Sequence, residues 1–156
     1  MRRIVALAAS LLTAAVALGS CGSDSEPDAA PPTTSTESGI QVTGEVGAKP
    51  ELEVPAGDPP AELVVDVLSE GDGSEVAAGD FLVANYLGQT WAAGGDGAAN
   101  VFDNSYDRGS PAGFPIGEGS VITGWDEGLV GQKAGSRLLL VVPPDKAYGD
   151  TPPEGS

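Results

Sequence analysis

Runs of apolar residues predict several short β-strands in the part of the chain after residue 60. Residues 62–68 and 80–87 are rich in strand-forming residues and are bounded by turn signals, and residues 100–103 and 113–116 predict two shorter strands. Residues 136–142 are almost continuously apolar, and two prolines follow them. Such a run predicts a strand that is buried on both faces.

One segment in this part of the chain, which begins at Thr123, favours a helix. Thr123 is expected to be its N-cap, Asp126 the capping-box partner three residues later, and Gly131 the stop signal. Trp125 and Leu129 are four residues apart, so they share one face of the helix. Together these elements predict an α+β fold, in which a small antiparallel sheet packs on one short helix.

The amino terminus is typical of a secretory signal. Two arginines precede the apolar run 4–18, which is shorter than the ~20 residues that a membrane-spanning helix needs. The run ends in Leu18-Gly19-Ser20-Cys21, which resembles the lipobox of bacterial lipoproteins. The resemblance implies that residues 1–20 are a signal peptide, that Cys21 is lipidated, and that the protein is extracytoplasmic and anchored to the bacterial cell membrane. An ordinary signal with a cysteine at this position by chance is the alternative.

Residues 21–60 are predicted to be a largely disordered acidic linker rich in Ser, Thr and Pro. At least residues 22–39 hold too few large apolar side chains to offset the entropy lost on ordering. Residues 52–60 are interrupted by proline and are expected to be extended. The folded domain is therefore expected to span residues 61–156, with a mobile Gly-rich hairpin tip at residues 92–99.

The charge and the missing residue types exclude several functions. A formal net charge of -16 argues against nucleic acid, because phosphate contacts need clustered Lys and Arg. The chain has no His and a single Cys. It therefore lacks the residues for the usual metal sites, for disulfide frameworks and for Ser-His or Cys-His catalysis. We expect no metal and no cofactor, and a monomer.

Residues 101–125 carry the most distinctive chemistry. They hold four of the eight aromatic residues of the chain, in a segment rich in Gly, Ser and Pro. Asp103 and Arg108 form an acid–base pair within it. A carboxylate among aromatic side chains is costly unless it is paired. The segment therefore predicts an apolar cavity with one charged, hydrogen-bonded rim.

The order of several short motifs resembles the FKBP family of peptidyl-prolyl cis-trans isomerases. The motifs, within residues 63–149, are Tyr86-Leu87-Gly88, Phe102-Asp103, Arg108, Phe114, Gly117, Val121-Ile122-Thr123-Gly124-Trp125, Glu127-Gly128, Gly135 and Ala147-Tyr148-Gly149. Each motif alone is weak, but their combined order is specific. The resemblance implies a half-barrel sheet wrapped around the helix, with a proline-binding pocket between them.

The resemblance also implies a role for each candidate residue. Trp125 is expected to form the pocket floor, and the other substrate-binding residues are Phe102, Arg108, Phe114, Val121 and Ile122. The Ile122 N–H and the Tyr148 hydroxyl are expected to bind carbonyls of a proline-containing polypeptide or of a macrolide of the rapamycin class. Asp103 is expected at the rim, held by Tyr86 and Arg108. Asp103, Tyr86 and Tyr148 are the expected catalytic residues, and none of them transfers a proton.

Each of these residues alone also has a purely structural explanation. Trp125 is typical of a core residue, and Tyr86 of a half-buried sheet residue. Asp103 and Arg108 are also typical of an exposed ion pair in a loop, which stabilises a fold by less than ~1 kcal/mol. Tyr148 is also suited to closing a turn against the sheet. For all of these residues except Asp103, only the joint order of the motifs favours a site.

Two features depart from the family pattern. Ala112 stands four residues after Arg108, where the family has a large aromatic, and this opens one wall of the expected pocket. The family also continues beyond Tyr148 with an apolar loop and a final strand between partners corresponding to residues 80–87 and 136–142. This sequence ends at Ser156, so we expect a C-terminally incomplete domain. Three explanations are a piece of a longer protein, an inactive product, or a domain completed by a strand from another chain.

Two functions from different classes fit these observations. The first is an extracytoplasmic prolyl isomerase, or rotamase, that acts on X-Pro bonds and assists the folding of exported proteins. The second is a non-catalytic peptide-binding or chaperone module that uses the same cleft. Neither function needs a nucleophile.

Overall fold

The structure is a computed structural model, and it describes residues 31–91 and 99–149. Its strands are β1 (Thr33–Ser35), β2 (Gln41–Thr43), β3 (Glu51–Glu53), β4 (Val64–Ser69), β5 (Phe81–Ala84), β6 (Leu87–Gln89), β7 (Val101–Asn104), β8 (Ala112–Pro115) and β9 (Arg137–Val141). Its helices are α1 (Thr123–Leu129) and the 3-10 helix η1 (Pro144–Lys146). Within these residues, no helix has both the length and the apolar character needed to cross a membrane.

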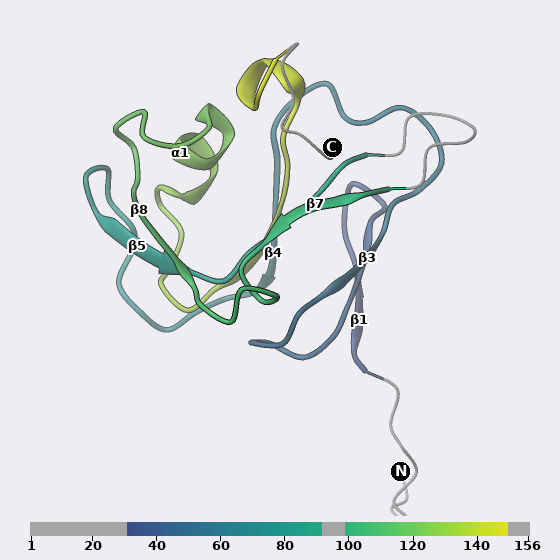
Figure 1. Ribbon diagram of the computed structural model, residues 1–156, viewed down its shortest axis with the longest axis horizontal. Helices are drawn as coiled ribbons and strands as arrows, with labels where there is room; N and C mark the ends of the chain where they lie inside the picture. The colour runs from purple at the N-terminus through teal and green to yellow at the C-terminus, as the bar shows by residue number, and fades with distance from the viewer. Residues whose placement is uncertain (1–30, 92–98, 150–156) are drawn as a thin grey trace, which may run out of the picture. The chain divides into compact units, whose positions relative to one another are not determined.

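The strand pairs are all antiparallel, and together with α1 they confirm the predicted α+β class (Figure 1). The hydrogen-bonded orders are β1–β2–β3, β4–β9, β5–β8 and β6–β7. Among the described residues, β9 pairs only with β4, and β5 pairs only with β8. The strands after residue 60 therefore form three separate ladders rather than one continuous sheet.

The strand predicted over residues 80–87 is interrupted at Tyr86, and this break separates β5 from β6. The Tyr86 N–H donates to the Ser105 hydroxyl at 2.9 Å, and the Ser105 N–H donates to the Tyr86 carbonyl at 3.0 Å. Ser105 is completely buried. The β5–β8 ladder ends at Ala84, and a separate ladder with β7 begins at Leu87.

Helix α1 lies where it was predicted, but its first turn is held differently. Its N-cap residue is Ile122, and no side chain makes a cap hydrogen bond, so the predicted capping role of Thr123 is wrong. The Asp126 carboxylate accepts hydrogen bonds from the N–H groups of Gly117, at 2.6 Å, and Gly119, at 2.7 Å. Asp126 therefore stabilises the loop before the helix instead of completing a capping box with Thr123.

Two buried glycines, Gly124 and Gly128, bring α1 close to the β4–β9 ladder. A methyl group at Gly124 would lie 2.3 Å from Cγ1 of Val142, and one at Gly128 would lie 2.8 Å from Cδ2 of Leu140. At these separations the Val142 or Leu140 side chain would have to move to admit a methyl group. The two glycines thus set the distance between α1 and β9.

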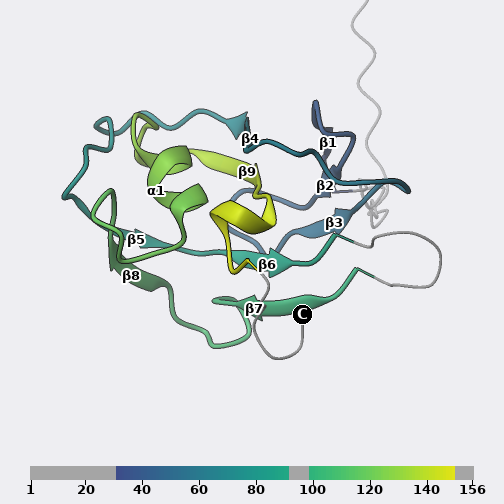
Figure 2. The same ribbon diagram turned by 90° about the horizontal axis from the view of Figure 1, so that it is seen from above.

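The opposite face of β9 packs against β1, β2 and β3, which we call the N-terminal sheet. Figures 1 and 2 both show α1 on one side of β9 and the N-terminal sheet on the other. Ile40 and Val42 form one buried cluster with Leu139 and Val141. Because successive side chains of a strand point to opposite faces, Leu140 lies toward α1 and Leu139 toward the N-terminal sheet. Leu139 and Val141 on one face of β9 are buried, whereas Leu138 and Leu140 on the other face are partly buried, so the predicted burial of residues 136–142 on both faces is confirmed for one face only.

The prediction of a largely disordered linker over residues 21–60 is wrong for residues 31–53, which contain the N-terminal sheet. Ile40, Val42 and Leu52 of this part belong to the core. Composition misled the prediction because Ile40 and Val42, two of few apolar residues there, are buried against β9. Residues 1–30, with the predicted signal peptide and Cys21, lie outside the described residues, as do residues 92–98 of the predicted Gly-rich tip.

Candidate functional site

The side chains of Tyr86, Asp103 and Arg108 form a closed hydrogen-bond network. Tyr86 lies between β5 and β6, Asp103 in β7, and Arg108 in the turn after β7. The Tyr86 hydroxyl donates to Oδ2 of Asp103, and Nη1 of Arg108 donates to Oδ1. Nη2 of Arg108 donates to the Tyr86 hydroxyl at 2.9 Å, and its guanidinium carbon lies 5.3 Å from the centre of the Tyr86 ring. Each of the three side chains therefore holds the other two.

This network favours an ionised Asp103 and a protonated Tyr86. The hydrogen bond from the Tyr86 hydroxyl lowers the pKa of Asp103 below its ordinary value, and the bond from Arg108 acts in the same direction. Burial raises the pKa of Tyr86, and the hydrogen bond to Asp103 raises it further. The Asp103 and Arg108 side chains are 44% and 47% exposed, so their ion pair contributes little to folding stability. Its main effect is to fix the orientation of the groups.

Trp125 of α1 is the centre of an aromatic cluster beside this network. Its ring lies 5.4 Å from the Tyr86 ring, edge to face, and 4.9 Å from the Phe114 ring of β8, measured between centroids. Aromatic pairs at such distances stabilise a fold beyond the area they bury. The structure thus brings together the helix, β8 and the charged network.

Phe102 of β7 and Tyr148, which follows η1, form a second aromatic contact. Their ring centroids are 6.3 Å apart and the rings are perpendicular. The Phe102 ring covers Gly88 of β6, where a methyl group would lie 2.7 Å from the ring. The predicted aromatic residues therefore include a second pair, which joins β7 to the segment after η1.

Val121 and Ile122 are half-buried residues that lead into α1. The Ile122 carbonyl accepts hydrogen bonds from the N–H groups of Trp125, at 2.9 Å, and Asp126, at 3.2 Å. The N–H groups at the start of a helix have no partner within the helix. The Ile122 carbonyl therefore holds the first turn of the helix that carries Trp125.

Two residues next to the network were missed in the sequence. The buried Ser105 hydroxyl donates to Oδ1 of Asn85 at 3.1 Å and accepts from Tyr86, so it supports the break that places Tyr86. Lys49 of the N-terminal sheet donates to the carboxylate of Asp107, 58 residues away in sequence. A single serine such as Ser105 belongs to no recognisable sequence pattern. The contact between Lys49 and Asp107 joins residues too far apart in sequence to be predicted from local patterns.

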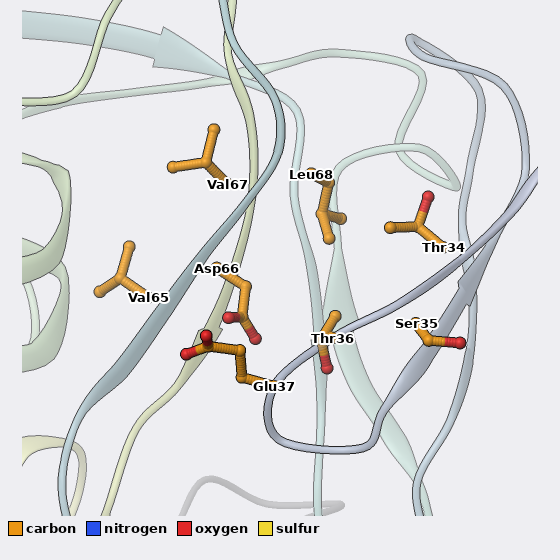
Figure 3. A pocket seen from close by; sticks show the side chains of 8 residues that line it. All are labelled: Thr34, Ser35, Thr36, Glu37, Val65, Asp66, Val67 and Leu68. Carbon is orange, nitrogen blue, oxygen red and sulfur yellow. The ribbon is translucent and has the colours of Figure 1, made fainter.

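A cavity of about 390 Å³ lies between the N-terminal sheet and β4 (Figure 3). Its lining residues are Thr34, Ser35, Thr36, Glu37, Val65, Asp66, Val67 and Leu68. None of the predicted site residues lines this cavity. Across residues 31–91 and 99–149, no group of three or more Cys, Asp or Glu side chains is arranged to hold a metal ion.

Comparison with known proteins identifies the class to which this fold and these residues belong. The sequence profile of the FKBP-type peptidyl-prolyl cis-trans isomerases matches residues 73–156, and the chain belongs to this family. This confirms the family inferred from the order of the motifs.

Similar proteins include two bacterial relatives. The FK506-binding protein of Streptomyces anulatus is 42% identical over 102 residues, which are 65% of this chain and 78% of that protein. The probable FK506-binding protein of Corynebacterium glutamicum is 39% identical over 108 residues, 69% of this chain and 83% of that protein. The crystal structure of AtFKBP13 matches with 34% identity and a TM-score of 0.48, over 58% of this chain and 73% of that structure.

Proposed function

We propose that this protein accelerates the cis-trans isomerisation of X-Pro bonds in exported polypeptides. Membership of the isomerase family carries the proposal. The contact between Trp125 and Tyr86 supports it, because it sets an apolar ring beside the Asp103–Arg108 network. The names of the two bacterial relatives support a macrolide of the FK506 or rapamycin class as a ligand of the same site.

The proposed chemistry needs no nucleophile and no proton transfer. An X-Pro bond isomerises over a barrier of ~20 kcal/mol, and twisting the amide reduces its charge separation. A site with little water disfavours the planar, more polar amide relative to the twisted one. Fixed hydrogen-bond donors can stabilise the carbonyl in its rotated position. The absence of histidine is therefore no obstacle to the reaction.

The described residues can supply these functions. The proline ring would lie on Trp125, between Phe102 and the residues Val121 and Ile122. The Ile122 N–H and the Tyr148 hydroxyl would bind carbonyl groups of the substrate. Asp103 would act by its charge and by orienting Tyr86 and Arg108.

The wall of the proposed site at Ala112 offers a small side chain. Ala112, the first residue of β8, stands where the family has a large aromatic side chain. A methyl group contributes much less apolar contact than an aromatic ring. Bulky ligands, and substrates with an aromatic residue before proline, are expected to bind less tightly for this reason.

A protease-coupled isomerisation assay on the purified full chain tests the proposal. The chain is expected to accelerate isomerisation of a proline-containing tetrapeptide, and FK506 is expected to abolish the acceleration by occupying the same site. Binding of the peptide without any acceleration would replace the isomerase with the non-catalytic peptide-binding module. A chain that neither binds nor accelerates would contradict both functions.

We also propose that the chain acts outside the cytoplasm, anchored through a lipid on Cys21. The basic start, the apolar run 4–18 and the lipobox-like Leu18-Gly19-Ser20-Cys21 support this location. Mass spectrometry of the chain expressed in a bacterium is expected to show an N-terminal acylated Cys21. A mature chain that starts elsewhere, or an unmodified Cys21, would contradict the anchor.

A further inference from the structure

The N-terminal sheet reaches the turn that carries Arg108. We propose that Lys49, in the connection between β2 and β3, is a positioning residue for Arg108. The inference rests on the proposed isomerase function, because Arg108 belongs to the proposed site. It adds to that site a part of the chain that precedes residues 73–156, the region matched by the family profile.

The N-terminal sheet is fixed to β9 by packing and by one strong hydrogen bond. Ile40 and Val42 are 4% and 3% exposed and pack with Leu139. Nη1 of Arg137 donates to the carbonyl of Gly44 at 2.5 Å. A sheet held in this way can fix the position of residues attached to it, such as Lys49, because its buried side chains leave little room for movement.

A second set of contacts fixes the N-terminal sheet to the strands of the site. The Gln89 side chain donates to the Leu52 carbonyl at 3.3 Å, and the Trp91 indole donates to the Gly57 carbonyl at 2.8 Å. Gln89 ends β6, which pairs with β7, the strand that carries Asp103. The sheet thus contacts both β9 and the β6–β7 ladder.

Lys49 makes the third contact, next to Arg108 itself. Its Nζ donates to both carboxylate oxygens of Asp107, at 2.7 and 2.8 Å. The Asn104 side chain donates to the same carboxylate at 2.9 Å and accepts from the Asp107 N–H at 2.8 Å. Hydrogen bonding from Lys49 is the main cause of the lowered pKa of Asp107, and Asn104 adds to it. Asp107 is therefore held from the N-terminal sheet and from the end of β7 together.

The turn after β7 has few other restraints on its exposed side. Its own backbone bonds are Gly109 N–H to the Tyr106 carbonyl, at 3.0 Å, and Ser110 N–H to the Ser105 carbonyl, at 3.4 Å. Asp107 and Arg108 are both exposed. Because Arg108 directly follows Asp107, a shift of Asp107 moves the guanidinium away from Asp103 and Tyr86.

The test compares Lys49→Glu with Lys133→Glu in the full chain. Lys133 forms an equally exposed ion pair with Glu70, at 2.6 Å, that contacts none of the site residues. The two variants change the net charge equally. Lys49→Glu is expected to lower kcat/KM for a proline-containing peptide by about two- to fivefold, the range of an exposed ion pair, whereas Lys133→Glu leaves it unchanged.

Three further measurements separate positioning from a loss of stability. Lys49→Arg keeps the charge and is expected to restore kcat/KM. The defect of Lys49→Glu is expected to shrink at 1 M salt, where charges are screened beyond ~3 Å. Thermal unfolding is expected to shift alike in Lys49→Glu and Lys133→Glu. Equal kcat/KM in the wild type and Lys49→Glu, or equal losses in both glutamate variants, would overturn the role of Lys49.

The two proposals fail in different ways. If the wild-type chain shows no isomerisation, the proposed function fails, and Lys49 is then judged by amide hydrogen exchange. Lys49→Glu is expected to speed exchange at Gly109 and Ser110, whose N–H groups close the turn, while Lys133→Glu does not. Unchanged exchange at both amides would overturn the positioning of the turn independently of activity.

Discussion

Val42→Asp is expected to destabilise the whole folded unit by about 3–5 kcal/mol, because it places an unpaired carboxylate in the core. Val42 is 3% exposed and packs in one cluster with Leu139 and Val141 of β9. A small domain has a net stability of only about 5–15 kcal/mol, so much of it is lost. Urea unfolding followed by circular dichroism measures the change.

Val46→Asp is the matched control for this substitution. Val46 lies in the same part of the chain but is 64% exposed, so the same change of side chain is expected to cost less than about 0.5 kcal/mol. Equal, small losses in both variants would show that the N-terminal sheet does not share the core of β9. The pair therefore tests the largest difference between the sequence-based prediction and the structure.

Trp125→Ala is expected to destabilise the fold by about 2–4 kcal/mol and to lower kcat/KM for X-Pro isomerisation at least tenfold. The stability loss follows from the removal of a half-buried ring that contacts Tyr86 and Phe114. The activity loss follows from the proposed role of Trp125 as the surface on which proline lies. Circular dichroism melting gives the first quantity, and the protease-coupled assay, run well below the melting temperature of the variant, gives the second.

Phe81→Ala serves as the control, because it also removes one aromatic ring. Phe81 lies on β5 and is 67% exposed, so its loss is expected to change stability and kcat/KM little. Trp125→Phe retains a ring at the helix and is expected to keep more activity than Trp125→Ala. A folded Trp125→Ala variant with the kcat/KM of the wild type would remove Trp125 from the proposed site.

The predictions that succeeded depend on local patterns. Residues 136–142 could be assigned as a strand of the core because an apolar run of that length has few alternatives. The helix could be assigned because its residues lie between loop signals and place Trp125 on a face with Leu129. The motifs around Phe102, Asp103 and Trp125 could identify the family because they follow one another in the order that is typical of it.

The predictions that failed concern contacts with residues outside the predicted element. The strand over residues 80–87 looks continuous in sequence, yet it breaks at Tyr86 because Ser105, nineteen residues later, binds its backbone. Thr123 has the chemistry of an N-cap, yet no side chain caps α1, and Asp126 holds the preceding loop instead. The break at Tyr86 depends on Ser105, and the role of Asp126 depends on Gly117. Local propensity includes neither partner.

The sequence by itself determined the family and the α+β class, because periodicity, turn residues and motif order are local properties of the chain. Only the tertiary structure decided that residues 31–53 fold, that Ile40 and Val42 cover β9, and that Lys49 contacts the turn of Arg108. The physical reason is that burial and ion pairing are properties of neighbours in space. A largely polar segment is ordered when β9 offers Ile40 and Val42 a surface to pack on, and composition alone does not show that surface.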